Sequence, residues 1–230
     1  MLVNIPIPVA VTNAERAYEY LRRVAIDFNI RPGERLNEGE IARHLNMSRA
    51  PVREAMNRLV SEGLLTAVPN LGFSCRRLSA SEILALYEVR GDLEAAAVAS
   101  LVPPAPPQVL ADLGQLSRSM RAGFGVESLD ALLDWDEEFH LRLAALAGNE
   151  ERVGILKHIN ARIRFVRRIN LEDPARVSSL DEHLQIVAAL EAGDIPGATL
   201  LVRRHLTLIA AEVAAAVNQS LARIYAPTVT

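Results

Sequence analysis

Cysteine is nearly absent from this chain of 230 residues, since Cys75 is the single one. One thiol excludes an internal disulfide framework and any zinc site built from several cysteines, and it indicates a reducing compartment. Long apolar runs are missing as well. The longest uncharged segments are residues 1–14, which lack a basic start, and residues 95–111, which carry four prolines. Neither is typical of a signal peptide or a membrane span, so the sequence predicts a cytoplasmic protein.

Lysine is also scarce, because every basic residue except Lys157 is an arginine. The overall composition, with 50% hydrophobic and 23% charged residues, is that of a globular protein rather than a disordered one. The net charge of −3 hides an asymmetry. Residues 1–78 hold 11 basic and 8 acidic residues, whereas residues 79–230 hold 14 and 20. This distribution predicts a small DNA-facing domain, 1–78, joined to a larger acidic domain, 79–230.

Turn residues and apolar spacing predict three helices and a hairpin in the first domain. The helices are expected at about residues 12–28, 38–45 and 49–62. Gly63 follows the third helix as a C-terminal cap would. Two short apolar runs flank the turn Pro69-Asn70-Leu71-Gly72, so a hairpin is expected over residues 64–77.

After Ser79 the sequence contains helical patterns and no convincing strand signal. Proline and glycine break the helices, which gives short connections. Six helices are expected, at about residues 79–101, 106–121, 127–147, 150–170, 176–192 and 194–217. The predicted fold is therefore mostly α, with a winged helix-turn-helix followed by an all-α six-helix bundle.

The third predicted helix has the pattern of a DNA recognition helix. Arg49, Arg53 and Asn57 are spaced i, i+4, i+8 and share one face, opposite the apolar face. Arginine can bind guanine and asparagine can bind adenine in the major groove. Ser48 lies at the expected N-cap, and a helix N-terminus favours phosphate. The alternative is that this is the solvated face of an ordinary amphipathic helix.

The wider context of this helix resembles a known family. The segments Ile30–Leu36, Glu40–Leu45, Ser48–Ala55 and Leu59–Leu64 resemble the winged helix-turn-helix of GntR-family transcription regulators. The resemblance implies that Arg35, Arg49 and Arg53 contact DNA and that Gly72 lies at the tip of the wing. One position departs from the family pattern. Members usually carry a basic residue two positions before that glycine, where this chain has Asn70.

Histidines and one carboxylate in the second domain form a candidate metal site. Asp136 and His140 are spaced i, i+4 on one predicted helix, so they share a face. His183 and His205 fall on the fifth and sixth predicted helices of the bundle, whose interior is a common place for a metal. One carboxylate and three imidazoles suit a divalent ion such as zinc or nickel. The alternative is that each histidine is buried with a hydrogen-bond partner and no metal.

The second domain carries further segments of a known pattern, which are Tyr87–Arg90, Leu93–Glu94, Asp136–His140, Gly148–Asn149, Glu182–His183 and Arg204–Leu206. In these segments it resembles the FCD effector domain of the FadR subfamily of GntR regulators, in its six-helix, VanR-like branch. The resemblance implies that the same four residues bind a metal and that an organic acid completes its coordination. It also implies that Arg90 binds the acid. A structural alternative for Arg90 is an ion pair with Glu94 one turn further on.

These features predict a ligand-responsive transcription repressor that binds operator DNA and a small carboxylate effector. A homodimer would match a two-fold operator, and helices 79–101 and 106–121 are expected in its interface. One alternative is a metal-dependent enzyme. The sequence has no His-Glu-x-x-His and no Gly-x-Ser-x-Gly pattern, so we do not expect an enzyme. Another alternative is a regulator for which the metal itself is the signal.

Overall fold

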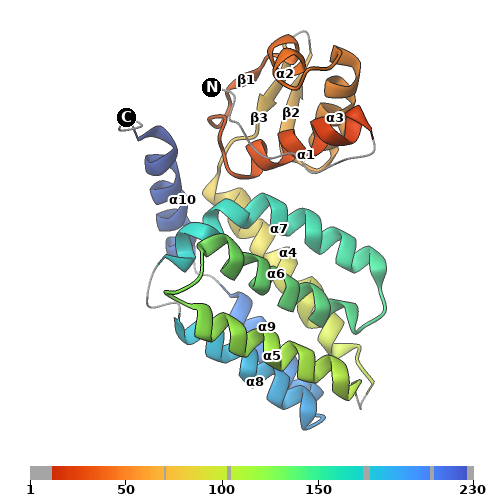
Figure 1. Cartoon of the computed structure of the whole chain (residues 1–230). Coiled ribbons are helices and arrows are strands. Elements are labelled where there is room, and N and C mark those ends of the chain that lie inside the picture. The colour runs from red at the N-terminus through yellow and green to blue at the C-terminus, as the bar shows by residue number, and fades with distance from the viewer. Residues whose placement is uncertain (1–11, 70, 103–104, 173–176, 208–209, 227–230) are drawn as a thin grey trace. The chain divides into compact units, whose positions relative to one another are not determined.

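The computed structural model describes residues 12–69, 71–102, 105–172, 177–207 and 210–226 (Figure 1). The chain divides into two compact units. The first comprises Met1–Ser79 and Val217–Thr230, and the second comprises Ala80–Ala216.

The first unit begins with the three helices and the hairpin that the sequence predicted, and it has one further short strand. The elements in chain order are α1 (Asn13–Ile26), β1 (Arg35–Leu36), α2 (Glu38–His44), α3 (Arg49–Ser61), β2 (Leu65–Val68) and β3 (Gly72–Cys75). The strand β1 was not predicted, because two residues show no periodicity. The sheet has the order β1-β3-β2 and is antiparallel. Asn70 lies outside the described residues, so its departure from the family pattern stays a sequence observation.

The helices α2 and α3 form the helix-turn-helix. Ile41 of α2 and Val52, Met56 and Leu59 of α3 are buried, and they give each helix an inward face. Ser48 occupies the N-cap of α3 with an extended backbone, but its side chain makes no capping hydrogen bond. The exposed face of α3 is therefore fixed by the packing of its apolar face rather than by a strong cap.

The second unit contains six complete helices within the described residues. They are α4 (Ala80–Ala99), α5 (Pro107–Gly123), α6 (Leu129–Ala145), α7 (Glu150–Leu171), α8 (Val177–Glu191) and α9 (Ile195–Leu206). The mostly helical fold class is confirmed. None of the described helices combines the length and the apolar character that crossing a membrane requires.

The prediction of a single last helix over residues 194–217 was wrong. The segment 194–217 is not one helix, because α9 ends at Leu206 and a further helix, α10 (Ala210–Tyr225), begins after it. Thr207 leaves the helical conformation with ψ of 117°, and its hydroxyl donates to the carbonyl of Arg203. A threonine that bonds the backbone in this way competes with helix continuation. The described residues after Ser79 thus contain seven helices, of which α10 is divided between the two units.

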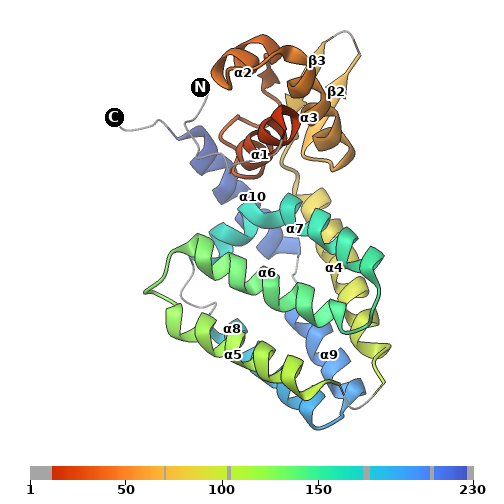
Figure 2. The ribbon, with the colours of Figure 1, turned by 45° about the vertical axis from the view of Figure 1, so that its right-hand side comes forward.

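The bundle has two layers, with α4, α6 and α7 in one and α5, α8 and α9 in the other (Figure 2). Its largest core cluster joins the two layers. Phe139 and Leu143 of α6 pack in this cluster with Ile186 of α8 and Val202 of α9, and all four are buried. These contacts hold α6, α8 and α9 together at the level where their polar side chains meet.

Candidate metal centre and DNA-contact surface

Four side chains from three helices bring one ligand atom each to a common point inside the second unit. Asp136 and His140 lie one turn apart on α6. His183 lies on α8 and His205 on α9. The four ligand atoms all lie within 4.8 Å of one another. The structure therefore brings together the residues that the sequence named as metal ligands.

The three imidazoles face one another through their Nε2 atoms. His205 Nε2 lies 2.9 Å from His183 Nε2 and 3.3 Å from His140 Nε2. Asp136 Oδ1 lies 3.5 Å from Nε2 of His183 and 3.7 Å from Nε2 of His140. Nitrogen donors bound to one zinc ion at its usual bond length lie about 2.9–3.4 Å apart. The spacing of these donors fits a single divalent ion.

Two glutamates orient the imidazoles. Glu94 Oε2 lies 2.6 Å from Nδ1 of His140, and Glu182 Oε2 lies 2.9 Å from Nδ1 of His205. Each carboxylate accepts a hydrogen bond from the Nδ1–H group of its ring, so in the neutral ring Nε2 carries the lone pair. Two lone pairs 3.3 Å apart repel each other, and a cation between them removes this repulsion. The donor chemistry therefore fits a metal as well as the spacing does.

Two arginines surround the same point. Arg167 of α7 is buried and donates to Oδ2 of Asp136, and it also lies 3.3 Å from Oε1 of Glu137. Arg90 of α4 is buried and donates through Nε to Glu94 at 2.7 Å. The ion pair that the sequence offered as one reading of Arg90 is therefore present. It leaves NH2 of Arg90 with no hydrogen-bond partner among the described residues.

Burial keeps the three imidazoles neutral, because a charged ring would lose its water. Burial lowers the pKa of His205 to about 4, and neighbouring His140 adds to this shift while the hydrogen bond to Glu182 opposes it. Burial likewise lowers the pKa of His140. The pKa of His183 lies well below its ordinary value because of burial and the two other histidines. Neutral imidazole is the form that binds a metal.

Two buried side chains next to the histidines, Glu94 and Arg167, are charged at neutral pH. Burial acts to raise the pKa of Glu94, but His140 and Arg90 outweigh it, and the pKa is about 2. Burial and the nearby charge of Arg90 lower the pKa of Arg167 to about 9. At neutral pH Glu94 is therefore ionised and Arg167 is protonated.

We expect the metal-free protein to lose stability as the pH falls from about 6.5, the ordinary pKa of histidine. Below that pH the histidines of the unfolded chain become protonated, whereas the buried imidazoles of the folded protein stay neutral. The free energy of unfolding therefore falls by up to about 1.4 kcal/mol for each histidine and each pH unit by which the pH is lowered. Urea unfolding of chelator-treated protein at about pH 7 and about pH 5.5 measures the slope. His183→Gln should make the slope shallower, whereas His158→Gln, at an exposed position, should not. A free energy of unfolding that rises towards pH 5.5 would contradict this account.

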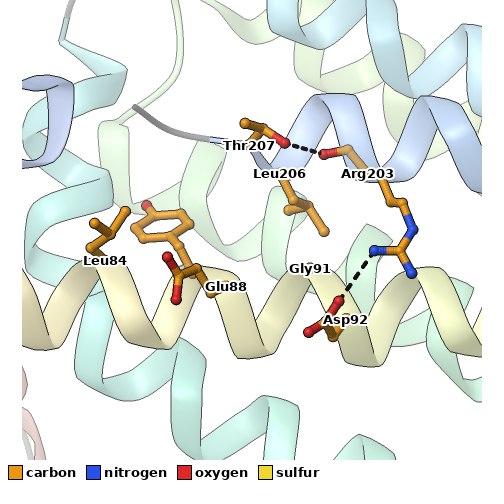
Figure 3. A pocket seen from close by; sticks show the side chains of 8 residues that line it. Leu84, Glu88, Gly91, Asp92, Arg203, Leu206 and Thr207 are labelled. Carbon is orange, nitrogen blue, oxygen red and sulfur yellow. Dashed lines mark hydrogen bonds and ion pairs between the residues drawn. The ribbon is translucent and has the colours of Figure 1, made fainter. Parts of the chain in front are cut away.

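A separate hollow of about 410 Å³ lies between α4 and α9 (Figure 3). Arg203 crosses it to Asp92 at 3.1 Å, and Tyr87, Glu88 and Thr207 also line it. None of the four metal-site residues lines this hollow. Leu206, which follows His205 in the chain, forms part of its wall. The hollow is thus a feature of the bundle surface and not the metal centre.

In the first unit, three of the predicted DNA-contact residues line one groove. Arg53 and Asn57 project from α3, and Gly72 begins β3, with a groove of about 610 Å³ between them and the hairpin. Arg53 is exposed but not free, because Glu38 accepts from its NH2 at 3.1 Å and from its Nε at 3.3 Å. Gly72 has a φ of +82°, a conformation that glycine adopts readily and other residues rarely do.

The other three predicted DNA-contact residues are exposed and do not line the groove. Arg35 on β1 donates to the carbonyl of Leu71 at 2.6 Å, so its guanidinium ties the sheet to the hairpin turn. The guanidinium of Arg49 lies over Gly39, where a Cβ atom would come within 3.0 Å of it. Glycine at position 39 therefore leaves room for this arginine. Ser48 precedes it at the exposed N-terminus of α3.

The contacts of Glu94, Glu182 and Arg167 with the candidate metal ligands were not predicted from the sequence. Glu182 directly precedes a candidate ligand, but its contact is with His205, 23 positions along the chain. Arg167 is one of several arginines of α7, and only its burial on the inner face of that helix distinguishes it from Arg168. A contact across three packed helices has no signal in local spacing.

Each of the two parts of the chain matches a known protein family. Residues 13–74 match the bacterial regulatory proteins of the gntR family, and residues 85–208 match the FCD domain. The Nta operon transcriptional regulator of Aminobacter aminovorans is 41% identical over 167 residues, which cover 73% of this chain and 78% of that relative. The HTH-type transcriptional repressor GlaR of Escherichia coli (strain K12) is 27% identical over 198 residues, covering 82% of this chain and 90% of that one.

The fold is also shared with solved structures. A GntR transcriptional regulator from Rhodococcus sp. RHA1 aligns with a TM-score of 0.67 and 28% identity, over 90% of this chain and 97% of that one. The family matches and the relatives are transcriptional regulators rather than enzymes. The chain belongs to the GntR family of bacterial transcriptional regulators, with a winged helix-turn-helix followed by an FCD domain, and it is a DNA-binding transcriptional regulator.

Proposed function

We propose that this regulator is a repressor whose second domain binds a divalent metal ion and a small carboxylate effector. The observation that carries the proposal is the convergence of Asp136 and three histidine Nε2 atoms, two of them oriented by glutamates. We assign the DNA contacts to a domain of residues 1–78 and effector binding to a domain of residues 79–230. The ligands of the metal are Asp136, His140, His183 and His205.

The donor set favours zinc or nickel over magnesium or calcium, because imidazole nitrogen suits the later transition metals. When bound, the metal supplies a positive charge and an open coordination position for a carboxylate oxygen of the effector. Arg90 supports the same ligand. Its NH2 group has no partner among the described residues, and a guanidinium binds carboxylate well. The unpaired NH2 group of Arg90 favours an organic acid as the signal over the metal alone.

We assign operator binding to the surface around α3. Arg49, Arg53 and Asn57 are proposed to read base edges in the major groove, and Ser48 at the start of α3 to contact phosphate. Arg35 is proposed to contact the phosphate backbone of the DNA, and Gly72 is proposed as the point where the wing comes close to the DNA. Bacterial operator DNA lies in the cytoplasm, so we propose that this protein is cytoplasmic. The relative GlaR is named a repressor, which supports repression rather than activation for this protein.

The effector can act on DNA binding only if it binds one arrangement of the protein more tightly than the other. The metal ligands come from α6, α8 and α9, and Arg90 comes from α4. A metal held by α6, α8 and α9 would already join the two layers of the bundle, and an acid that joins this metal to Arg90 would add α4 to the connection. We propose that this connection favours the arrangement with low operator affinity.

Calorimetry on metal-loaded and chelator-treated protein tests the proposed site. We expect zinc to bind with a stoichiometry of one per chain, and carboxylic acids such as L-malate and succinate to bind after zinc is loaded. Arg90→Lys keeps the charge but loses the planar fork, and it should weaken acid binding while zinc binding remains. Acid binding of equal strength with and without zinc would contradict a metal-completed site.

We also propose a homodimer, because a two-fold protein matches a two-fold operator. The helices assigned to its interface are α4 and α5. Val89 of α4 is a large apolar side chain that is 48% exposed. Sedimentation at micromolar concentration should give twice the chain mass of 25.1 kDa. We expect Val89→Glu to favour the monomer, whereas Ile155→Glu, at an equally exposed site on α7, should not. A wild-type monomer would contradict the dimer.

A further inference from the structure

Several buried polar atoms in the bundle have no hydrogen-bond partner among the described residues. They include both amide atoms of Asn160, NH2 of Arg90 and Nδ1 of His183. These side chains are at most 2% exposed. A buried polar atom without a partner costs folding free energy, so most such atoms in proteins are paired. Asn160 is the most unusual of them, because neither end of its amide is satisfied.

Helix register places Asn160 near the level of the candidate metal centre. On α7, Arg167 interacts with Asp136 of α6, and Arg164 lies 3.0 Å from Glu137. Asn160 lies one turn before Arg164, and His140 lies one turn after Asp136. Because α6 and α7 run antiparallel, these contacts place Asn160 within about one helical turn of the level of His140.

The contact between α4 and α7 gives the same placement. Tyr87 of α4 interacts electrostatically with Arg167, and Ala97 packs in one cluster with Leu156 of α7. Arg90 lies between Tyr87 and Ala97 on the buried side of α4, and Asn160 lies between Leu156 and Arg167 on the buried side of α7. The unpaired groups of Arg90 and Asn160 thus belong to the same part of the interior.

We infer that Asn160 binds an uncharged polar group of the effector, and that the effector is a carboxylic acid carrying a hydroxyl or amide group. This inference rests on the proposed function. Arg90 NH2 only donates, so its partner is a carboxylate oxygen. The amide of Asn160 donates and accepts, and a hydroxyl or an amide satisfies both ends. A second carboxylate only accepts, and it would leave Oδ1 of Asn160 unpaired against a negative charge.

Stability without any effector gives the first test. An unpaired amide weakens the free protein, so its removal should stabilise chelator-treated protein, as replacement of functional residues often does. We expect Asn160→Leu or Asn160→Ala to raise the thermal midpoint by about 2–4 °C. Asn149→Leu is the matched control. Asn149 caps α7 by accepting from the backbone N–H of Arg152 at 3.0 Å, so its loss should lower the midpoint. A fall in both Asn160 variants would overturn the inference.

Matched acids give the second test, by calorimetry on zinc-loaded protein. L-malate and succinate differ by one hydroxyl, as do L-lactate and propionate. We expect the wild type to prefer the hydroxy acid by about tenfold or more, and Asn160→Leu to lose this preference. An unchanged preference in the variant would overturn the inference and leave the proposed function standing. If none of the four acids binds the zinc-loaded wild type, both the inference and the proposed function are contradicted.

Discussion

Replacing His183 with alanine is expected to remove the bound metal and the response to acid, while DNA binding remains. His183 is fully buried, and its Nε2 lies within 3.5 Å of donor atoms from both other helices of the site. Loss of one of four donors should lower zinc affinity by more than about 100-fold, since even partners of metal ligands contribute 10–100-fold. Elemental analysis after dialysis and calorimetry with zinc measure the change.

Two further variants set the scale for this result. His158→Ala removes an exposed histidine of α7 that is not part of the donor cluster, and it should bind zinc like the wild type. Glu94→Gln keeps the shape of the partner of His140 but removes its charge, and it should lower zinc affinity by about 10–100-fold. Stoichiometric zinc retained by His183→Ala would contradict the assigned site.

Arg49→Ala and Arg53→Ala are each expected to weaken specific operator binding by about 1–3 kcal/mol, which is about 5–150-fold. The physical reason is that each bidentate contact to a base is lost with nothing to replace it. Arg53 is held by Glu38 in the free protein, so DNA must displace this ion pair on binding. Fluorescence anisotropy with a duplex selected by the protein from a random library measures the affinity.

Arg58→Ala is the matched control on the same helix. Arg58 pairs with Glu15 at 2.9 Å and stacks over Tyr18 at 3.8 Å, so its change should affect stability and leave sequence preference intact. Arg35→Ala should weaken binding to all sequences and reduce the salt slope by about one, as expected for a phosphate contact. Wild-type operator affinity in both Arg49→Ala and Arg53→Ala would remove α3 as the recognition helix.

Much of the fold could be predicted because its signals are local. The apolar spacing of Val52, Met56 and Leu59 marks the inner face of α3, and Gly63, at φ of +70°, ends that helix. The break between α9 and α10 was not predicted, because Thr207 is compatible with a helix in sequence. Its hydroxyl bond to the backbone of Arg203 is visible in the structure and not in the spacing of apolar residues.

The sequence predicted that the four side chains of the candidate metal site converge, but it did not predict what surrounds them. Asp136 and His140 share a helix face, and His183 and His205 fall on two later predicted helices of the same bundle. The resemblance to the FCD domain implied that these four residues bind one metal. The partners of these ligands come from other helices. Glu94 lies 46 positions before His140, and Arg167 lies 31 positions after Asp136. No periodic pattern links residues so far apart, so the orienting network required the packed bundle.

The most direct test of the central claim is acid-dependent release of operator DNA with and without the metal. The protein is bound to its selected duplex, and L-malate or succinate is added to zinc-loaded and to chelator-treated samples. The account predicts release from the zinc-loaded wild type, and no release from the chelator-treated protein or from His183→Ala. Equal release of DNA from zinc-loaded and metal-free protein would show that the Asp136 and histidine centre does not carry the signal.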